Sequence, residues 1–408
     1  MIRRLGGDRA GEIRVSRFLR NPHVSEAEMV ATAALRTAER CAGRHVLAIQ
    51  DTTAVRADPA GGGGLYLHAT IAVDAVAGDI LGPIDMRYCE RTAGKRQHRT
   101  ARGFDVKESA RWLVGAERAA ETCAGAARIT VVADRESDIY ELFARRPASV
   151  GLIIRATQDR ALGDGGRLFA TADTLPEAGR MTVDLPAAPG RRARRMTLAL
   201  RWTQTEIRRP TRRSAARDGV LPETTPITIV DAREVDPPAG ETPAHWRLLT
   251  TDAVGDVSDA RRVVATYRRR WAIEQVFRTM KTKGFDVEGL RIEEDAPRRK
   301  LVIATCIAAI IVQQLVHARD GAGNRPFDDA FDPDDGTALQ ALCRKLEGAT
   351  KRQKNPHPPN SLAFAAWVCA RLGGWTGYYG KPGPIVMLRG WLQFCAIKHG
   401  WTLAHHNV

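Results

Sequence analysis

The amino-acid sequence predicts an α/β protein with a β-rich insertion and an all-helical carboxy-terminal region. Two apolar runs, residues 45–51 and 128–134, have the pattern of strands, and each one ends in an aspartate. Between about 160 and 245, short β-like runs alternate with Pro and Gly, which indicates a folded antiparallel insertion. From residue 266 onward the apolar spacing is mostly helical. We therefore expect an amino-terminal helical region over 1–44, an α/β domain over 45–325 and a helical region over 326–408.

The charge of the chain limits its partners. Its 408 residues include 62 Lys and Arg against 47 Asp and Glu, so the formal net charge is +15 and the pI is about 9.9. This excess favours a polyanionic partner, and nucleic acid is the leading candidate. An anionic membrane surface is a weaker candidate, because no basic amphipathic segment with a strongly apolar opposite face stands out.

The sequence favours a cytoplasmic protein without a membrane span. The longest apolar run, residues 301–316, is interrupted by polar residues and is shorter than a spanning helix, so we expect a buried core helix. No amino-terminal signal segment is visible. The seven Cys are scattered without a C-x-x-C motif, which argues against disulfides and zinc, and we expect buried free thiols.

The first part of the chain predicts a helix followed by a meander. A capping box at residues 25–28 begins a helix that continues to residue 42, ahead of the first strand. Residues 65–73 and 80–88 complete an antiparallel meander with that strand. The glycine run 61–64 lacks the Lys-Ser/Thr ending of a phosphate-binding loop, so a hairpin loop explains it better.

The middle of the chain predicts a second group of α/β elements. Helices are expected over 107–123 and 139–145, and a short strand over 153–155. Two basic stretches suit contact with a phosphate backbone: the loop 90–102, which includes His98, and the stretch 191–217, which carries ten Arg.

Asp51 and Asp134 are candidate metal ligands. A strand that ends in aspartate presents the carboxylate at the edge of the sheet, where a metal ion can bind without leaving a buried charge unpaired. The alternative for Asp51 is ordinary turn chemistry, because Thr52 and Thr53 follow it.

Residues 266–284 predict the front of a long helix with a chemically mixed stripe. At about 100° per residue, the side chains of Tyr267, Arg270, Glu274 and Lys281 fall on one face. The alternative is a solvated face with salt bridges. By chance this combination would occur about once in a few thousand tyrosines at average composition, so it favours a functional explanation.

The spacing Y-x2-R-x3-E-x6-K of this stripe resembles the Y-R-E-K signature of the bacterial DDE transposases of the insertion-sequence-4 family, which include the transposon-five type enzymes. Further matches are D-R-E-x-D, R-F-x-x-N-P-x-V, K-E-S-x-R-W and P-P-x-G-E-T-P-x-x-W, which begin at Asp134, Arg17, Lys107 and Pro237. The resemblance covers almost all of the chain from Arg17 onward.

The resemblance implies an RNase H-like domain that cuts and joins DNA. Asp51, Asp134 and Glu274 would be the catalytic metal ligands. Three carboxylates can hold two Mg²⁺ ions, for which Mn²⁺ can substitute; one ion activates the attacking water or 3′ hydroxyl, and the other stabilises the leaving oxygen.

The implied partner is double-stranded DNA, at the transposon ends and at the target. The residues expected to contact it are Arg155, Trp246, Tyr267, Arg270 and Lys281. In this interpretation Trp246 stacks on a flipped base beside a hairpin intermediate, although a buried core tryptophan is the general alternative.

The resemblance also implies a homodimer in the DNA complex, formed through the carboxy-terminal helices. Because only 16 residues precede Arg17, we expect the family's amino-terminal end-recognition domain to be reduced to a remnant. Two other functions stay open: a shortened, non-catalytic transposase that inhibits by mixed dimerisation, and a structure-specific nuclease of the same fold.

Overall fold

The computed structural model describes residues 9–57, 64–91, 108–185, 193–211, 221–281, 284–290, 292–321, 323 and 325–405. Several features expected from the sequence lie outside the described residues. They are most of the glycine run 61–64, the basic loop 92–102 with His98, and parts of the arginine-rich stretch 191–217.

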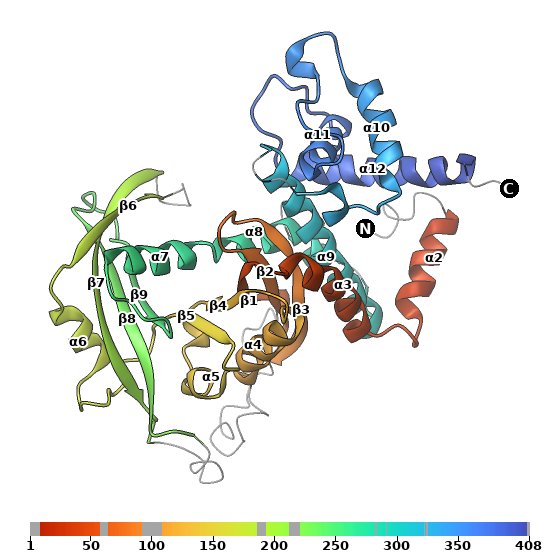
Figure 1. Ribbon diagram of the computed structural model, residues 1–408. Helices are drawn as coiled ribbons and strands as arrows, with labels where there is room; N and C mark the ends of the chain where they lie inside the picture. The colour runs from red at the N-terminus through yellow and green to blue at the C-terminus, as the bar shows by residue number, and fades with distance from the viewer. Residues whose placement is uncertain are drawn as a thin grey trace.

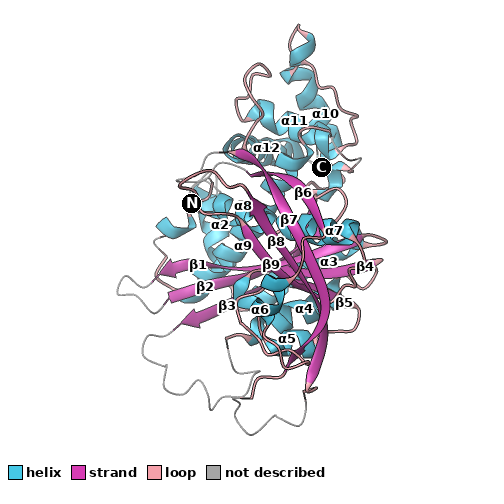
Figure 2. Cartoon of the chain, turned by 90° about the vertical axis from the view of Figure 1, so that its left-hand side faces the viewer, coloured by secondary structure: helices cyan, strands magenta, loops and turns pink. Residues whose placement is uncertain are grey.

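One sheet of nine strands forms the centre of the described structure, in the order β3-β2-β1-β4-β5-β9-β8-β7-β6 (Figures 1 and 2). β1, β4 and β5 are parallel to one another, β1 to β3 form the expected antiparallel meander, and β9 runs antiparallel to β5. This mixed α/β architecture is consistent with the expected RNase H-like fold. The strands are β1 (His45–Ala57), β2 (Gly64–Asp74), β3 (Ile80–Arg91), β4 (Arg128–Ala133), β5 (Val150–Arg155), β6 (Gly179–Leu185), β7 (Arg194–Arg208), β8 (Thr224–Val235) and β9 (His245–Thr250).

Helices cover both faces of the central strands. Because side chains alternate along a strand, Leu47 and Ile49 of β1 join one buried cluster and Val46 and Ala48 join the other. The first cluster also contains residues of α3 (Glu26–Cys41), α7 (Val257–Arg268), α8 (Trp271–Met280) and α9 (Asp295–Ala318). The second contains residues of α4 (Ala110–Thr122), α5 (Tyr140–Arg145) and α6 (Leu168–Thr174).

The insertion extends the same sheet. Strands β6, β7 and β8 lie within the expected range of about 160–245, and β9 joins them to β5 through three residue pairs. Figure 1 shows the long strands β7 and β8 on the left of the molecule, with α6 beside them. The two parts of the sheet therefore share one backbone hydrogen-bond network.

Asp51 does not end its strand. β1 continues to Ala57 in partnership with β2, although its parallel pairing with β4 ends at Ile49 and Val132. The prediction of a strand end at Asp51 is therefore wrong for β1 as a whole, because β2 supplies partners that the sequence pattern of β1 alone does not reveal. Asp134 follows β4 directly, as expected.

The helix expected over 266–284 is broken into two. α7 ends at Arg268 and α8 begins at Trp271, and the backbone N–H groups of Arg269 and Arg270 bond carbonyls three residues back. Three successive arginines reach different partners: Arg268 the carbonyl of Asp184, Arg269 the carbonyl of Val76, and Arg270 the carboxylate of Asp51. These contacts lie at the break between α7 and α8, which the hydrophobic periodicity of the sequence does not predict.

α8 also ends earlier than expected, at Met280. The chain then turns so closely that a Cβ on Gly284 would lie 2.2 Å from the carbonyl oxygen of Thr279. Glycine is therefore required at this position.

The helical region packs on the carboxy-terminal half of α9. Val312, Leu315 and Ala318 of α9 join a third buried cluster with α10 (Asp335–Leu346), α11 (Leu362–Leu372) and α12 (Pro384–His405). By length and composition α9 could cross a membrane, but 67% of its most apolar window is buried within the protein. The expected core helix over 301–316 is thus found inside α9. α2 (Arg9–Arg20) also packs against α9.

The seven cysteines are free thiols, as expected. Burial is confirmed for five of them, whereas Cys395 is exposed and Cys89 is half-buried.

Candidate active site

The register of β1 and β4 brings Asp51 and Asp134 to the same level. The parallel pairs run from His45 with Arg128 to Ile49 with Val132, and two further steps along each chain reach the two aspartates. Because side chains alternate, Asp51 lies on the face of Leu47 and Ile49, which α8 covers.

Each aspartate is fixed by a local backbone donor. The N–H of Thr52 donates to Oδ1 of Asp51 over 2.7 Å, and the N–H of Glu136 donates to Oδ1 of Asp134 over 3.0 Å. Asp134 is thereby the cap of a short 3₁₀ turn, Arg135–Ser137. One oxygen of each carboxylate is held, which restricts its rotation.

Arg270 joins the third acid to the first. Its Nη1 lies 3.2 Å from Oδ2 of Asp51, and its Nη2 donates to Oε1 of Glu274. Arg270 precedes α8 and Glu274 lies in its first turn, so the i,i+4 spacing survives the break between α7 and α8. The guanidinium is only 13% exposed and lies between two acids that are distant in sequence.

The site carries a surplus of negative charge. Burial raises the pKa of Asp51 to about 6, Arg270 and the Thr52 N–H oppose this rise, and Asp134 and Glu274 add to it. Burial lowers the pKa of Arg270, but Tyr267 and the three acids outweigh it and leave that pKa above its usual value. The three acids are therefore close enough to sense one another, with Arg270 as their counter-ion.

The donor set suits a hard divalent cation. Mg²⁺ prefers carboxylate oxygens, and the mutual repulsion of these acids is what such an ion relieves. Within the described ranges, no three His, Cys, Asp or Glu side chains already stand together as a metal shell. The fit to Mg²⁺ therefore rests on the chemistry and charge of Asp51, Asp134 and Glu274, beside Arg270.

Three of the residues expected to contact DNA lie near this cluster: Tyr267, Trp246 and Arg155. Tyr267 is 5% exposed and its ring lies 6.3 Å from that of Trp246, tilted by 57°. Trp246 is half-buried on β9 and packs against the core, so it has features of both interpretations given above. Arg155, at the end of β5, donates to the carbonyl of His245 over 2.9 Å, and it interacts electrostatically with Tyr267.

Lys281 caps the carboxy-terminal end of α8, and its backbone N–H bonds the carbonyl of Phe277. It follows the last residue of α8 and forms an ion pair of 2.8 Å with Glu288. The structure thus brings Tyr267, Arg270 and Glu274 together and places Lys281 beside another acid.

Other charged residues near the acids have no role predicted from the sequence. Asp138 is buried and binds Arg160 over 2.6 Å and the N–H groups of Thr157 and Gln158, which marks it as structural. Arg111 forms a bridge to Glu136. The sequence marks Arg111 only as part of the K-E-S-x-R-W segment, and it marks Glu136 and Asp138 only as part of the D-R-E-x-D segment.

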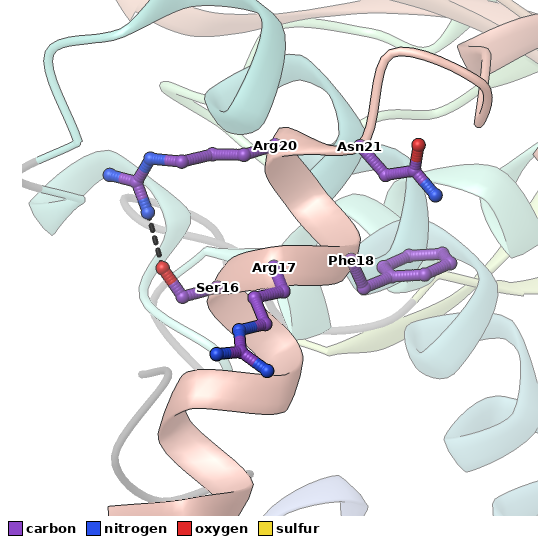
Figure 3. A pocket seen from close by; sticks show the side chains of 5 residues that line it. All are labelled: Ser16, Arg17, Phe18, Arg20 and Asn21. Carbon is purple, nitrogen blue, oxygen red and sulfur yellow. Dashed lines mark hydrogen bonds between the residues drawn. The ribbon is translucent and has the colours of Figure 1, made fainter.

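A surface pocket lies elsewhere, at the end of α2 (Figure 3). Its lining comes from the R-F-x-x-N-P segment, and Arg20 there also binds Glu294 over 2.7 Å. None of the residues expected at the active site lines it. The lining residues are Ser16, Arg17, Phe18, Arg20 and Asn21.

Acids gathered on the central strands of a mixed sheet, beside an arginine, fit the class of enzymes that act on phosphodiester bonds with metal ions. Residues 81–311, more than half of the chain, match the family model described as "Transposase DDE domain". The chain belongs to this family of DDE transposases. The matched range contains Asp134 and Glu274 and begins after Asp51.

Proposed function

We propose that this transposase cuts and joins transposon ends by two-metal phosphodiester hydrolysis and strand transfer, in the manner of the insertion-sequence-4 family. The observation that carries the proposal is the charge cluster in which Arg270 bonds Asp51 and Glu274 while Asp134 raises the pKa of Asp51. Three acids that repel one another around one cation are the arrangement that a pair of divalent ions would stabilise.

The three acids would hold the metal ions in this proposal. Asp51, Asp134 and Glu274 are the ligands, and bound Mg²⁺ supplies activation of the attacking oxygen and stabilisation of the leaving oxygen. The backbone donors of Thr52 and Glu136 keep the two aspartates oriented. Preorganised ligands reduce the rearrangement needed during the reaction.

The cations and aromatic rings nearby bind DNA. Arg155, Arg270 and Lys281 contact phosphates, and the net charge of +15 supports such contacts over a wider surface. Tyr267 is buried, so it acts chiefly by holding the cations. Trp246 stacks on a flipped base next to a hairpin end, and the helices after residue 325 form the contact of a homodimer.

The decisive experiment is a strand-transfer assay. The purified protein is incubated in Mg²⁺ with a duplex that carries the element's own end and with a supercoiled target plasmid. We expect joined products from the natural protein, none in EDTA, and none from Glu274→Gln. The exposed Glu293→Gln serves as the matched control and should be fully active.

Cutting without joining would contradict strand transfer and favour the structure-specific nuclease. Wild-type cutting by Glu274→Gln would contradict the metal-ligand assignment itself.

A further inference from the structure

The backbone ladder does not extend to the two aspartates. The parallel pairing of β1 with β4 stops at Ile49 and Val132, and β4 itself ends at Ala133. Past that point β1 stays paired with β2 on its other side. No ladder bond between β1 and β4 therefore spans Asp51 and Asp134 themselves, and side-chain contacts between the two segments can adjust their separation.

Arg111 supplies a link between the two segments. It lies in the first turn of α4, and its side chain is only 8% exposed. Its Nε donates to Oγ1 of Thr52 over 3.3 Å, and its Nη2 donates to Oε2 of Glu136 over 2.8 Å. The Thr52 hydroxyl also lies 3.0 Å from Nδ1 of buried His68, which fixes its other side.

The two residues that Arg111 holds are the ones whose N–H groups hold the acids. Thr52 donates to Asp51, and Glu136 donates to Asp134. A continuous path of hydrogen bonds and short backbone steps thus joins one carboxylate to the other. Because every step is local, a shift of Arg111 would move both donors.

We infer that Arg111 and Glu136 form a positioning bridge that sets the spacing of Asp51 and Asp134 for metal binding. The inference rests on the proposed function, since it assumes that both aspartates are ligands. Groups that orient metal ligands from behind commonly contribute about 10- to 100-fold to metal affinity or activity.

A direct DNA contact by Arg111 fits the structure less well. Its Nη1 already meets the carbonyl of Glu108 at 2.8 Å and the Glu108 carboxylate at 3.2 Å, in addition to Thr52 and Glu136. These acceptors take up most of the five N–H groups of a guanidinium. Its stem is also buried, with the guanidinium carbon 5.1 Å from the centre of the Trp112 ring.

The test uses the full chain and two readouts: binding of Mn²⁺ measured by electron paramagnetic resonance, and nicking rate as a function of Mg²⁺ concentration. Glu136→Gln removes the charge of the bridge and leaves Arg111 in place. Arg111→Met removes the donors. Arg118→Met is the matched control, since Arg118 lies on the same helix and forms an exposed pair with Glu121 over 2.6 Å.

We expect Glu136→Gln and Arg111→Met to weaken Mn²⁺ binding and raise the Mg²⁺ requirement by about 10- to 100-fold. The double variant should be no worse than Arg111→Met, because both changes break one bridge. Arg118→Met should match the natural protein. DNA affinity and its salt dependence should not change in any of them.

Normal metal binding and Mg²⁺ requirement in Glu136→Gln would overturn the inference. So would an Arg111→Met protein whose salt slope falls by about one unit while its metal requirement is normal, because that result identifies a phosphate contact. Asp51→Asn separates the two levels of the argument. If it keeps natural nicking, the proposed function fails; if it is inactive while both bridge variants behave normally, only the bridge fails.

Discussion

Two clusters of acids and arginines lie at the same sheet and differ in charge balance, because three acids share one arginine in the first and two acids meet two arginines in the second. In the first, Asp51, Asp134 and Glu274 share Arg270, and the pKa of Asp51 rises to about 6. Burial is the largest cause of that rise, and the neighbouring acids increase it further.

In the second cluster the arginines equal the acids in number, and His245 is a further partner. Asp231 on β8 is fully buried and binds His245 over 2.7 Å and Arg247 over 3.0 Å, with Arg233 at 3.7 Å. Burial alone would raise the pKa of Asp231 too, but His245 and Arg247 outweigh it and bring that pKa below its usual value. Asp173, which accepts from both arginines, also has a lowered pKa.

This difference in charge balance distinguishes a candidate cation-binding site from a set of ion pairs that stabilises the fold. Asp231 is fully buried and Asp51 is 18% exposed, yet the pKa of Asp231 is lowered and that of Asp51 is raised, so burial alone does not explain the difference. A largely buried acid beside other acids carries negative charge that nearby cations do not fully compensate, and such uncompensated charge is typical of cation sites. The charge of a buried acid beside arginines is compensated by those arginines, so its role is to stabilise the packing of the strands.

The largest expected difference between the clusters is in catalysis. Asp134→Asn should lower the rate of Mg²⁺-dependent nicking by about 10³-fold, since removing one preorganised group at the reacting charge typically costs that much. Asp231→Asn should leave the rate per folded molecule unchanged. Nicking of an end-bearing duplex, normalised to the folded fraction, measures both. Similar losses of nicking rate in the two variants would show that the two clusters do not differ in catalytic role.

The next difference is in stability. Asp231→Asn should lower the free energy of unfolding by about 3 kcal/mol, because it leaves buried cations without their partner. The folded pKa of Asp231 is lowered, so its stabilisation is present above the unfolded pKa and disappears as the pH falls through the folded value. Urea unfolding at pH 7 and at low pH checks both statements. A variant as stable as the natural protein at pH 7 would show that the network contributes little.

The smallest expected effect has the opposite sign. The folded pKa of Asp51 is raised, so stability falls as the pH rises from about 4 to about 6, and the loss stays constant at higher pH. Asp51→Asn should therefore be more stable than the natural protein by about 1 to 2 kcal/mol at pH 7, and equal to it below pH 4. Thermal unfolding across this pH range in EDTA measures the difference. Destabilisation at pH 7 would place Asp51 with the structural acids.

The sequence predicted the elements of the fold whose signal is local. The strands around Asp51 and Asp134, the meander and the core helix within α9 follow from hydrophobic pattern, and each is present. The extension of β1 past Asp51 was missed because it depends on pairing with β2. The residues of a strand do not reveal how far a distant partner strand extends it.

The parts of the candidate site that could be predicted are those whose residues lie at helical spacing along the sequence. Arg270 and Glu274 form the expected i,i+4 contact despite the break before α8. Tyr267 and Lys281 were expected on one uninterrupted helix, but Tyr267 lies near the end of α7 with 5% exposure, and Lys281 follows the last residue of α8 and pairs with Glu288. The link from Arg111 to Glu136 joins two segments through tertiary contact, so spacing within either segment does not predict it.

The shared helix α9 has a mechanical consequence for the molecule. Its first half is part of the core under the sheet, and its second half is part of the core of the helical region. Figure 1 shows it passing from one to the other without a linker. A helix of 24 residues transmits torque and displacement as a rigid lever over about 36 Å, at 1.5 Å per residue. A force applied to α10, α11 or α12 is therefore transmitted to the neighbourhood of α8, which carries Glu274.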